Sequence, residues 1–156
     1  MSYVGPIVAA AEAAGYLPLR PGWTRLAPTP PWLADVQRPG GIERLESRLG
    51  VKTPSALREF WQQPDLMRLL SSRGDADYLG PIEEDLPSWI RWGDAWYLVF
   101  CIYPHSGLVG TVPLNGEPNP PIYYGWEGDK APFQEVPVRF SEFLGIALRS
   151  LMSRDE

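Results

Sequence analysis

The sequence predicts an α+β fold: a mixed, largely antiparallel sheet of about four to six strands, packed with N-terminal helices and a closing C-terminal helix. Two observations predict it. Apolar residues recur at helical spacing before residue 71 and after residue 139, and between these regions lie short strand-like runs separated by turns rich in proline and glycine. Helices, then an antiparallel meander, then one more helix are typical of an α+β domain.

The chain opens with a short helix predicted over residues 5–15, with Pro6 at the first helical position and Gly15 past the end. Residues 16–41 carry six prolines, but tryptophans and leucines are interleaved with them, which is not typical of a solvated linker. We therefore expect residues 1–41 to form a helix and a proline-rich arm docked on the body. Residues 42–156 would form the main α+β domain of a single globular unit.

Two helices are predicted before the sheet. Residues 42–49 place apolar side chains at helical spacing with charges between them, and Gly50 follows as a stop. Thr53 then supplies a cap and Pro54 a first helical position, and the apolar residues at 57, 60 and 61 predict a core-facing stripe. Pro64 breaks or kinks this helix, and a further helical segment follows it.

The central strand is predicted over residues 96–103, eight apolar or aromatic residues without charge or glycine. Strict alternation would put residues 96, 98, 100 and 102 on one face and 97, 99, 101 and 103 on the other, so both faces would be covered. A four-residue turn over 104–107 leads to a returning strand over 108–114, which ends at Pro113 or lies at an edge.

The rest of the chain completes the meander and closes it. Residues 122–126 and 133–138 predict a third and a fourth strand. Residues 140–152 predict the closing helix, with Ser141 as its N-cap and an apolar stripe that includes Phe143 and Leu151.

The totals exclude several classes of protein. A single cysteine excludes an intramolecular disulfide or a cysteine-based metal cluster, and a single histidine argues against a zinc site or a catalytic triad. No apolar run has the length of a membrane span, and the N-terminus lacks the basic region of a signal peptide. We expect a soluble, cytoplasmic protein without metal or cofactor, in which Cys101 is a buried, inert thiol.

The net charge of −5 is concentrated in one stretch. Residues 75–88, here called the acidic segment, contain no base and five acids: Asp75, Asp77, Glu83, Glu84 and Asp85. This pattern disfavours nucleic acid and anionic membranes as partners and favours a basic protein surface. The alternative is a solvated loop that keeps the protein soluble.

Two further groups of residues are candidates for binding. Trp89 and Trp92 border the acidic segment, and an aromatic anchor beside charge of one sign is typical of a protein-binding hot spot, although either side chain alone would also suit the core. Trp126 stands beside Glu127 and Asp129, where an aromatic platform with two acids suits a sugar-binding cleft. These two acids also suit a turn that serves the backbone.

Three segments together resemble a known family. Residues 42–54, continuing to 61, form a "Glu-x-x-Leu-Gly" helix, a proline and a second helix that ends in aromatic residues. Residues 96–100, before a glycine-containing turn, resemble the central strands of that family. Residues 121–124 resemble its last strand, and residues 138–144 resemble its closing helix, which has the pattern "Ser-Phe-x-x-Phe-Leu". This order resembles the SUKH superfamily, the Smi–Knr group of fungal cell-wall-assembly regulators and bacterial immunity proteins, over residues 40–152.

The resemblance implies an α+β fold and a non-catalytic, protein-binding role. The first hypothesis is an immunity protein of a bacterial polymorphic toxin system, which neutralises a cognate toxin with a basic surface, such as a nuclease, by occlusion. The acidic segment would steer the toxin, and Trp89 or Trp92 would supply contact area. The alternatives are an intracellular scaffold of the fungal-regulator type and a small enzyme that acts on a glycan or ligand through Trp126, Glu127 and Asp129.

Overall fold

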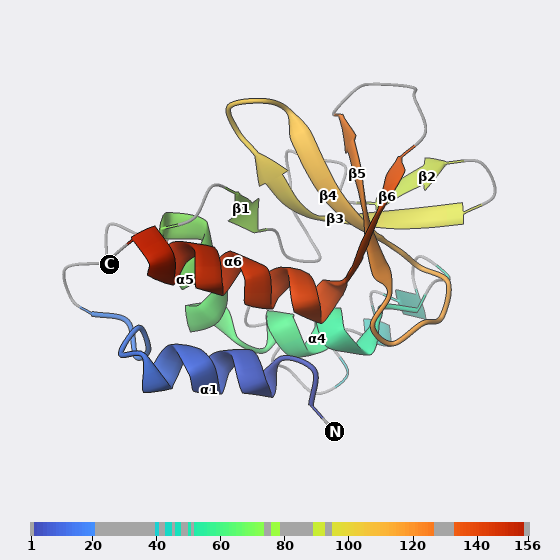
Figure 1. The fold of residues 1–156 in the computed structure, drawn as a ribbon. Helices are drawn as coiled ribbons and strands as arrows, with labels where there is room; N and C mark the ends of the chain where they lie inside the picture. Colours follow the sequence, from blue (N-terminus) through green and yellow to red (C-terminus); the bar gives the residue numbers. More distant parts are fainter. Residues whose placement is uncertain are drawn as a thin grey trace.

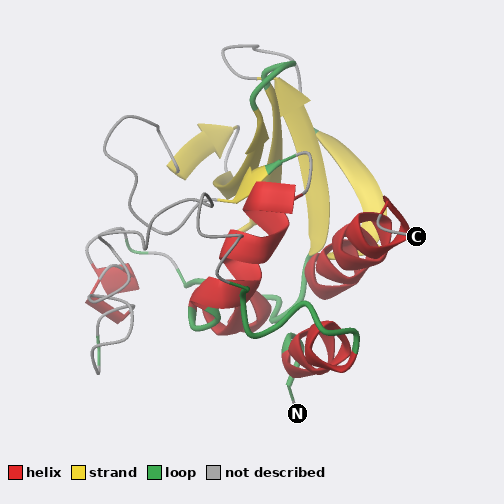
Figure 2. Ribbon diagram, turned by 90° about the vertical axis from the view of Figure 1, so that its left-hand side faces the viewer, coloured by secondary structure: helices red, strands yellow, loops and turns green. Residues whose placement is uncertain are grey.

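The computed structural model of the chain describes residues 2–20, 40, 43–44, 46–47, 50, 52–73, 76–78, 89–92, 95–126 and 133–154, with the backbone alone for residues 72, 73, 89, 91 and 92. This part of the chain folds into a twisted sheet with helices packed against one face (Figures 1 and 2). The helices described are α1 (Gly5–Ala13), α4 (Ser55–Trp61), α5 (Pro64–Arg73) and α6 (Phe140–Arg154). The α+β fold predicted from the sequence is confirmed.

The sheet has six strands in the described part of the chain, and all their pairings are antiparallel. The strands are β1 (Asp77–Tyr78), β2 (Trp89–Trp92), β3 (Ala95–Tyr103), β4 (Leu108–Pro113), β5 (Pro121–Trp126) and β6 (Gln134–Arg139). Their order is β1-β3-β4-β5-β6, and β2 pairs with β3 on the same side as β1, since β4 occupies the other side. The last four strands, the turn over 104–107 and the end of β4 at Pro113 agree with the sequence prediction. β1 and β2 were not predicted, because two and four residues are too few to show a period.

A β-bulge in β3 changes which side chains face the helices. The register with β4 shifts between Val99 and Cys101, so that Phe100 and Cys101 both pack into the main core. Tyr103 then faces the core as well, while Ile102 packs with Val99 on the opposite side. The strict alternation expected for this strand is therefore wrong after residue 100.

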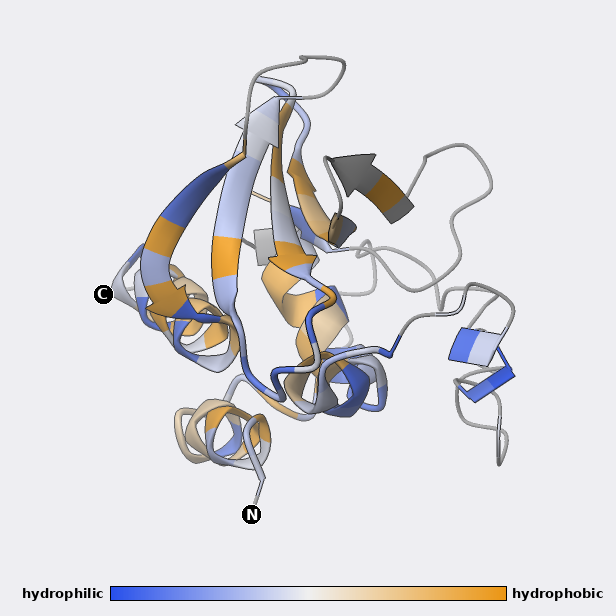
Figure 3. Ribbon diagram, turned by 90° about the vertical axis from the view of Figure 1, so that its right-hand side faces the viewer, coloured by the Kyte–Doolittle hydropathy of each residue, from blue (hydrophilic) through white to orange (hydrophobic). Residues whose placement is uncertain are grey.

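The main core lies between the sheet and the helices. Leu57, Phe60 and Trp61 of α4 are buried there, which confirms the core-facing stripe predicted from the sequence. At the opposite edge of the sheet from β1, β6 alternates hydrophobic and hydrophilic bands along its length (Figure 3), and Val136 and Val138 pack against the core.

The starts of α4 and α6 differ from the expected caps. Thr53 does not cap α4; Pro54 is the N-cap residue, and the Thr53 N–H donates to Glu46 Oε2 at 2.6 Å. The helix α6 begins at Phe140, one residue before the expected cap, Ser141. Asn119, from the loop before β5, accepts the Ser141 N–H at 3.0 Å and donates to its hydroxyl at 2.8 Å.

The N-terminal helix is held against the body by a carboxylate of α4. Glu59 Oε2 accepts the backbone N–H groups of Tyr3 at 2.7 Å and Val4 at 2.8 Å, directly before α1 begins. A carboxylate at this end of a helix is favoured by the helix dipole. Gly15, at φ 82°, ends this segment as predicted, and α1 packs on α6. The proline-rich arm between residues 21 and 39 lies outside the described residues.

We predict that Gly110→Ala destabilises the protein by about 1–3 kcal/mol, the usual cost of overpacking a core. A Cβ at residue 110 would lie 2.6 Å from Cys101 Sγ and 3.2 Å from Phe100 Cζ, because the bulge pushes both side chains against β4. Urea unfolding measures the change in the free energy of unfolding.

The matched control is Gly145→Ala in α6. A Cβ there meets only Arg149 Nη1 at 3.5 Å, so this change should stabilise the protein by roughly 0.5–1 kcal/mol through helix propensity. If Gly110→Ala were as stable as the natural protein, the tight contact at the bulge would be refuted.

Candidate binding site

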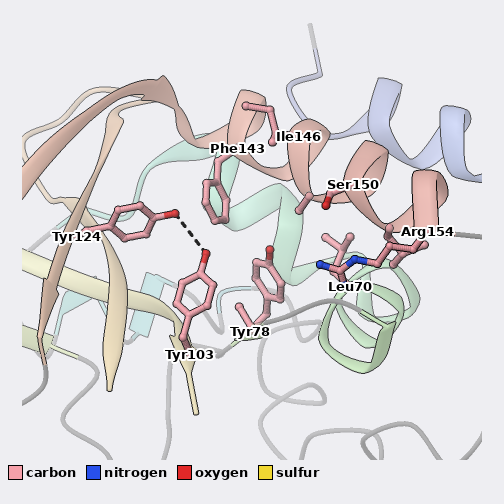
Figure 4. Close-up of a pocket in the computed structure, with 11 residues that line it drawn as sticks. Leu70, Tyr78, Tyr103, Tyr124, Phe143, Ile146, Ser150 and Arg154 are labelled. Atoms are coloured by element: carbon pink, nitrogen blue, oxygen red, sulfur yellow. Dashed lines mark hydrogen bonds between the residues drawn. The ribbon is translucent and has the colours of Figure 1, made fainter. Parts of the chain in front are cut away.

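A pocket of about 210 Å³ opens where the sheet meets the C-terminal half of α6 and the end of α5 (Figure 4). Its walls come from α5, from β1 and the residue before it, from β3 and β5, and from α6. The residues that line it are Leu70, Ala76, Tyr78, Tyr103, Tyr124, Phe143, Ile146, Ala147, Ser150, Leu151 and Arg154.

Strand geometry brings the tyrosines into this pocket. Along β1, Tyr78 is buried and Asp77 is exposed, because consecutive side chains of a strand point to opposite sides. The bulge turns Tyr103 of β3 toward the helices, where it meets Tyr124 of β5. The two hydroxyl oxygens lie 3.2 Å apart, and the rings pack edge to face at 6.1 Å (Figure 4).

Helix α6 supplies the other long wall. Phe143, Ala147 and Ser150 recur at helical spacing along the side that faces the pocket, and the ring of Phe143 packs edge-on against Tyr124 at 6.3 Å. The small side chains of Ala147 and Ser150 leave the space that the pocket occupies. Ile146, 45% exposed, lies at the rim, and Arg154 stands in the last turn, where a cation is favoured by the helix dipole.

The polar groups of the lining are hydrogen-bond donors and one cation. They are three phenol hydroxyls, the hydroxyl of Ser150 and the guanidinium of Arg154; no carboxylate is among the eleven lining residues. Burial raises the pKa of Tyr124, while its hydrogen bond to Tyr103 opposes this shift. The Tyr124 phenol is therefore neutral at physiological pH, and the lining combines aromatic walls with a few placed polar groups, as ligand pockets do.

Neither the cysteine nor the histidine of the chain lines this pocket. Cys101 is fully buried, and burial raises the pKa of its thiol well above the ordinary value. His105 lies exposed in the turn between β3 and β4. Among the described residues, no group of three histidine, cysteine, aspartate or glutamate side chains is close enough to hold a metal ion.

The structure places only some of the binding residues predicted from the sequence. Asp77 is exposed on β1, between the pocket-lining residues 76 and 78. Trp89 and Trp92 begin and end β2, with their side chains outside the described part. Trp126, at the end of β5, is 51% exposed. The remaining candidates lie outside the described residues: Asp75, Glu83, Glu84, Asp85, Glu127 and Asp129.

The described residues on either side of 79–88, an undescribed part of the acidic segment, lie at one edge of the sheet. Tyr78 pairs with Cys101 and Trp89 pairs with Leu98, so β1 and β2 lie against the same side of β3. Their partners are three residues apart on β3, about 10 Å at the usual rise of a strand. This edge also borders the pocket, because Ala76 and Tyr78 line it.

Sequence reasoning missed the pocket itself. Its lining residues are scattered between positions 70 and 154, and the sequence contains no motif that joins them. The sequence contains one weak indication of the pocket. Ala147 and Ser150 place small side chains on a side of the closing helix that otherwise carries phenylalanine and leucine.

Comparisons with models of protein families, with curated proteins and with solved structures find no match to this chain. In the part of the chain that the structure describes, no helix has the length and apolar character needed to cross a membrane.

We predict that Cys101 of the native protein resists thiol reagents such as dithionitrobenzoate. Its sulfur is buried, and its raised pKa keeps it as the unreactive thiol at pH 8. Labelling should therefore proceed through unfolding, at least about 10³-fold more slowly than in denatured protein.

A matched control is Ser106→Cys, which adds a thiol in the exposed turn after β3. This variant should label rapidly at one thiol per chain, while the second thiol stays protected. Rapid labelling of the natural protein would contradict the burial of Cys101.

Proposed function

We propose that this chain is a non-catalytic protein-binding domain of the SUKH type, an immunity protein that binds a cognate toxin and neutralises it by occlusion. The order of its elements supports the proposal, since helices precede an antiparallel meander and one helix closes it, as the resemblance implies for residues 40–152. The residue types of the pocket suit binding, because they are aromatic rings and hydrogen-bond donors.

The observation that carries this proposal is the way in which the acidic segment is held. Tyr78, within the segment, and Trp89, directly after it, pair with the same edge of β3, and the one described acid of the segment, Asp77, is exposed there. Five acids without a base within fourteen consecutive residues give this part of the chain a local excess of negative charge. Such an excess raises the rate at which a basic partner associates, by roughly 10- to 10³-fold at low salt.

In this proposal the acids steer the toxin, and apolar contact then keeps it bound. Trp89 and Trp92 are the anchors proposed for that contact, because β2 carries both of them beside the acidic segment. A cognate toxin with a basic active-site groove, such as a nuclease, would be blocked simply by being covered. A scaffold with an endogenous partner would use the same edge, so the identity of the captured protein distinguishes the two roles.

The test is affinity capture with the full chain from extract of its native cells, washed at low and then moderate salt, with mass spectrometry of the retained proteins. The double variant Glu83→Lys/Glu84→Lys is run in parallel. A single basic, toxin-like protein should be retained by the natural chain and lost by this variant. With the purified partner, the association rate of the variant should fall at least about tenfold at low salt.

The matched control is Glu12→Lys/Glu135→Lys. These residues are exposed on α1 and β6, away from the β1–β2 edge, and the net charge changes by the same amount. This control should bind as the natural chain does. Equal association kinetics in all three proteins would show that the acidic segment does not steer the partner. Capture of a housekeeping assembly would favour the scaffold role.

A second candidate, an enzyme acting on a glycan, is favoured by the exposure of Trp126 at 51%. A sugar ring would stack on this side chain, with Glu127 and Asp129 beside it in the sequence. Isothermal titration with oligosaccharides tests this role, and Trp126→Ala should abolish any signal. Binding that survives Trp126→Ala would refute it.

A further inference from the structure

We infer that the pocket between the sheet and α6 binds a small uncharged phenol, a single aromatic ring with one hydroxyl group and a short substituent. This site requires no protein partner, so it stands independently of the proposed immunity function.

The volume of the pocket suits one substituted ring. An apolar cavity of about 150 Å³ accommodates benzene, and drug-sized ligands occupy pockets of roughly 300–1,000 Å³. At about 210 Å³, this pocket lies between the two, so a ring with a hydroxyl and a methyl or similar group fills it.

The lining is mainly aromatic and aliphatic. Nine of the eleven lining side chains are of these kinds: Leu70, Ala76, Tyr78, Tyr103, Tyr124, Phe143, Ile146, Ala147 and Leu151. A flat ring gains edge-to-face and dispersion contacts with such walls. An ionised ligand would have to leave water for them, whereas a phenol carries no charge at neutral pH.

The walls are fixed by the main core, so the pocket exists before a ligand enters it. The ring of Tyr78 packs edge-on against Phe60 at 5.6 Å, and that of Phe143 packs edge-on against Phe100 at 5.4 Å. Closing the pocket would require these rings to leave their partners in a close-packed interior. A preformed site spares the ligand the cost of ordering it.

A pair of hydroxyls in the wall favours a ligand that both donates and accepts a hydrogen bond. The hydroxyl oxygens of Tyr103 and Tyr124 lie 3.2 Å apart, and either can be the donor (Figure 4). If Tyr103 donates, Tyr124 can still donate its own proton; if Tyr124 donates, its oxygen can still accept. A ligand hydroxyl suits both arrangements, whereas a carbonyl or an ether suits only the first.

The first experiment titrates the purified full chain with p-cresol and follows its amide signals by NMR. Toluene lacks the hydroxyl, methylcyclohexanol lacks the aromatic ring, and p-toluate and p-methylbenzylamine carry a charge of either sign. p-Cresol should bind roughly three- to tenfold more tightly than toluene, through one hydrogen bond. Its advantage over methylcyclohexanol should be of similar size, roughly three- to tenfold, through the aromatic contacts.

Both charged probes should bind more weakly than p-cresol, and the amide signals that shift should include those of residues 76–78 and of the C-terminal half of α6. A charged probe that binds as tightly as p-cresol would overturn the inference. Shifts confined to other residues, or no shift with p-cresol at millimolar concentration, would do the same.

Variants assign the binding to the hydroxyl pair. Tyr103→Phe/Tyr124→Phe keeps both rings and removes both hydroxyls together, so it should bind toluene as before and lose the preference for p-cresol. The matched control is Tyr97→Phe/Tyr123→Phe, on the same two strands, where the rings contact each other at 5.4 Å and do not line the pocket. This control should keep the preference.

Equal ratios of p-cresol affinity to toluene affinity in the two double variants would refute the site. Ala147→Phe adds a ring to the pocket wall on α6 and should abolish the binding of both compounds. If this variant does not fold, the two double variants still decide.

A tyrosine side chain of a partner protein has the same chemistry as p-cresol. N-acetyltyrosinamide is therefore a further probe, and it should bind more weakly than p-cresol, because the pocket has room for a ring and a short substituent only. Tighter binding of N-acetyltyrosinamide would overturn the assignment to a free small molecule and would identify a tyrosine of a partner protein as the ligand.

Discussion

The packing of Phe100 is the constraint on which the rest of this structure depends. Its fully buried ring meets Phe140 edge-on at 5.0 Å and Phe143 at 5.4 Å, and it lies 6.4 Å from Tyr78. Phe60 of α4 in turn packs against Phe140 and Tyr78. These aromatic contacts, each worth about 0.5–1.5 kcal/mol beyond the area they bury, join β1 and β3 to two helices that are far apart in the sequence.

The bulge beside Phe100 connects this core to the pocket. An extra residue in β3 places Phe100 and Cys101 on the same side. Gly110, opposite them, has no Cβ and so leaves room for these two side chains. The same shift sends Tyr103 to the helix side, where it meets Tyr124. A regular strand would have put Tyr103 on the other face of the sheet, so the pocket lining follows from a departure from regular geometry that also shapes the core.

The parts of the fold that local sequence determines were predictable, and those that depend on distant residues were not. The β3–β4 hairpin follows from one apolar run, a turn and a proline within eighteen residues. Asn119, which accepts the Ser141 N–H in the first turn of α6, and Glu59, which accepts the Val4 N–H directly before α1, lie more than twenty residues away from these groups in the sequence, so no local motif records them. The bulge is equally invisible, because residues 96–103 are apolar or aromatic throughout, so a shift of one residue leaves no trace in the pattern. The pocket combines both difficulties, since it needs the bulge and lining residues from five separate elements.

Strand β1 has only two residues, and these separate the apolar pocket from the exposed acidic surface. Its two residues pair with Ile102 and Cys101, and their alternation sends Tyr78 into the pocket and Asp77 to the outside. Only two backbone positions hold this strand in the sheet. Its place is also secured by the ring of Tyr78, which packs against Phe60 at 5.6 Å and near Phe100, and by the Tyr78 N–H, which donates to Ser71 Oγ at 3.0 Å. Tyr78 lines the pocket, so any group that fills the pocket contacts the residue next to Asp77, the described acid of the acidic segment at this edge of the sheet.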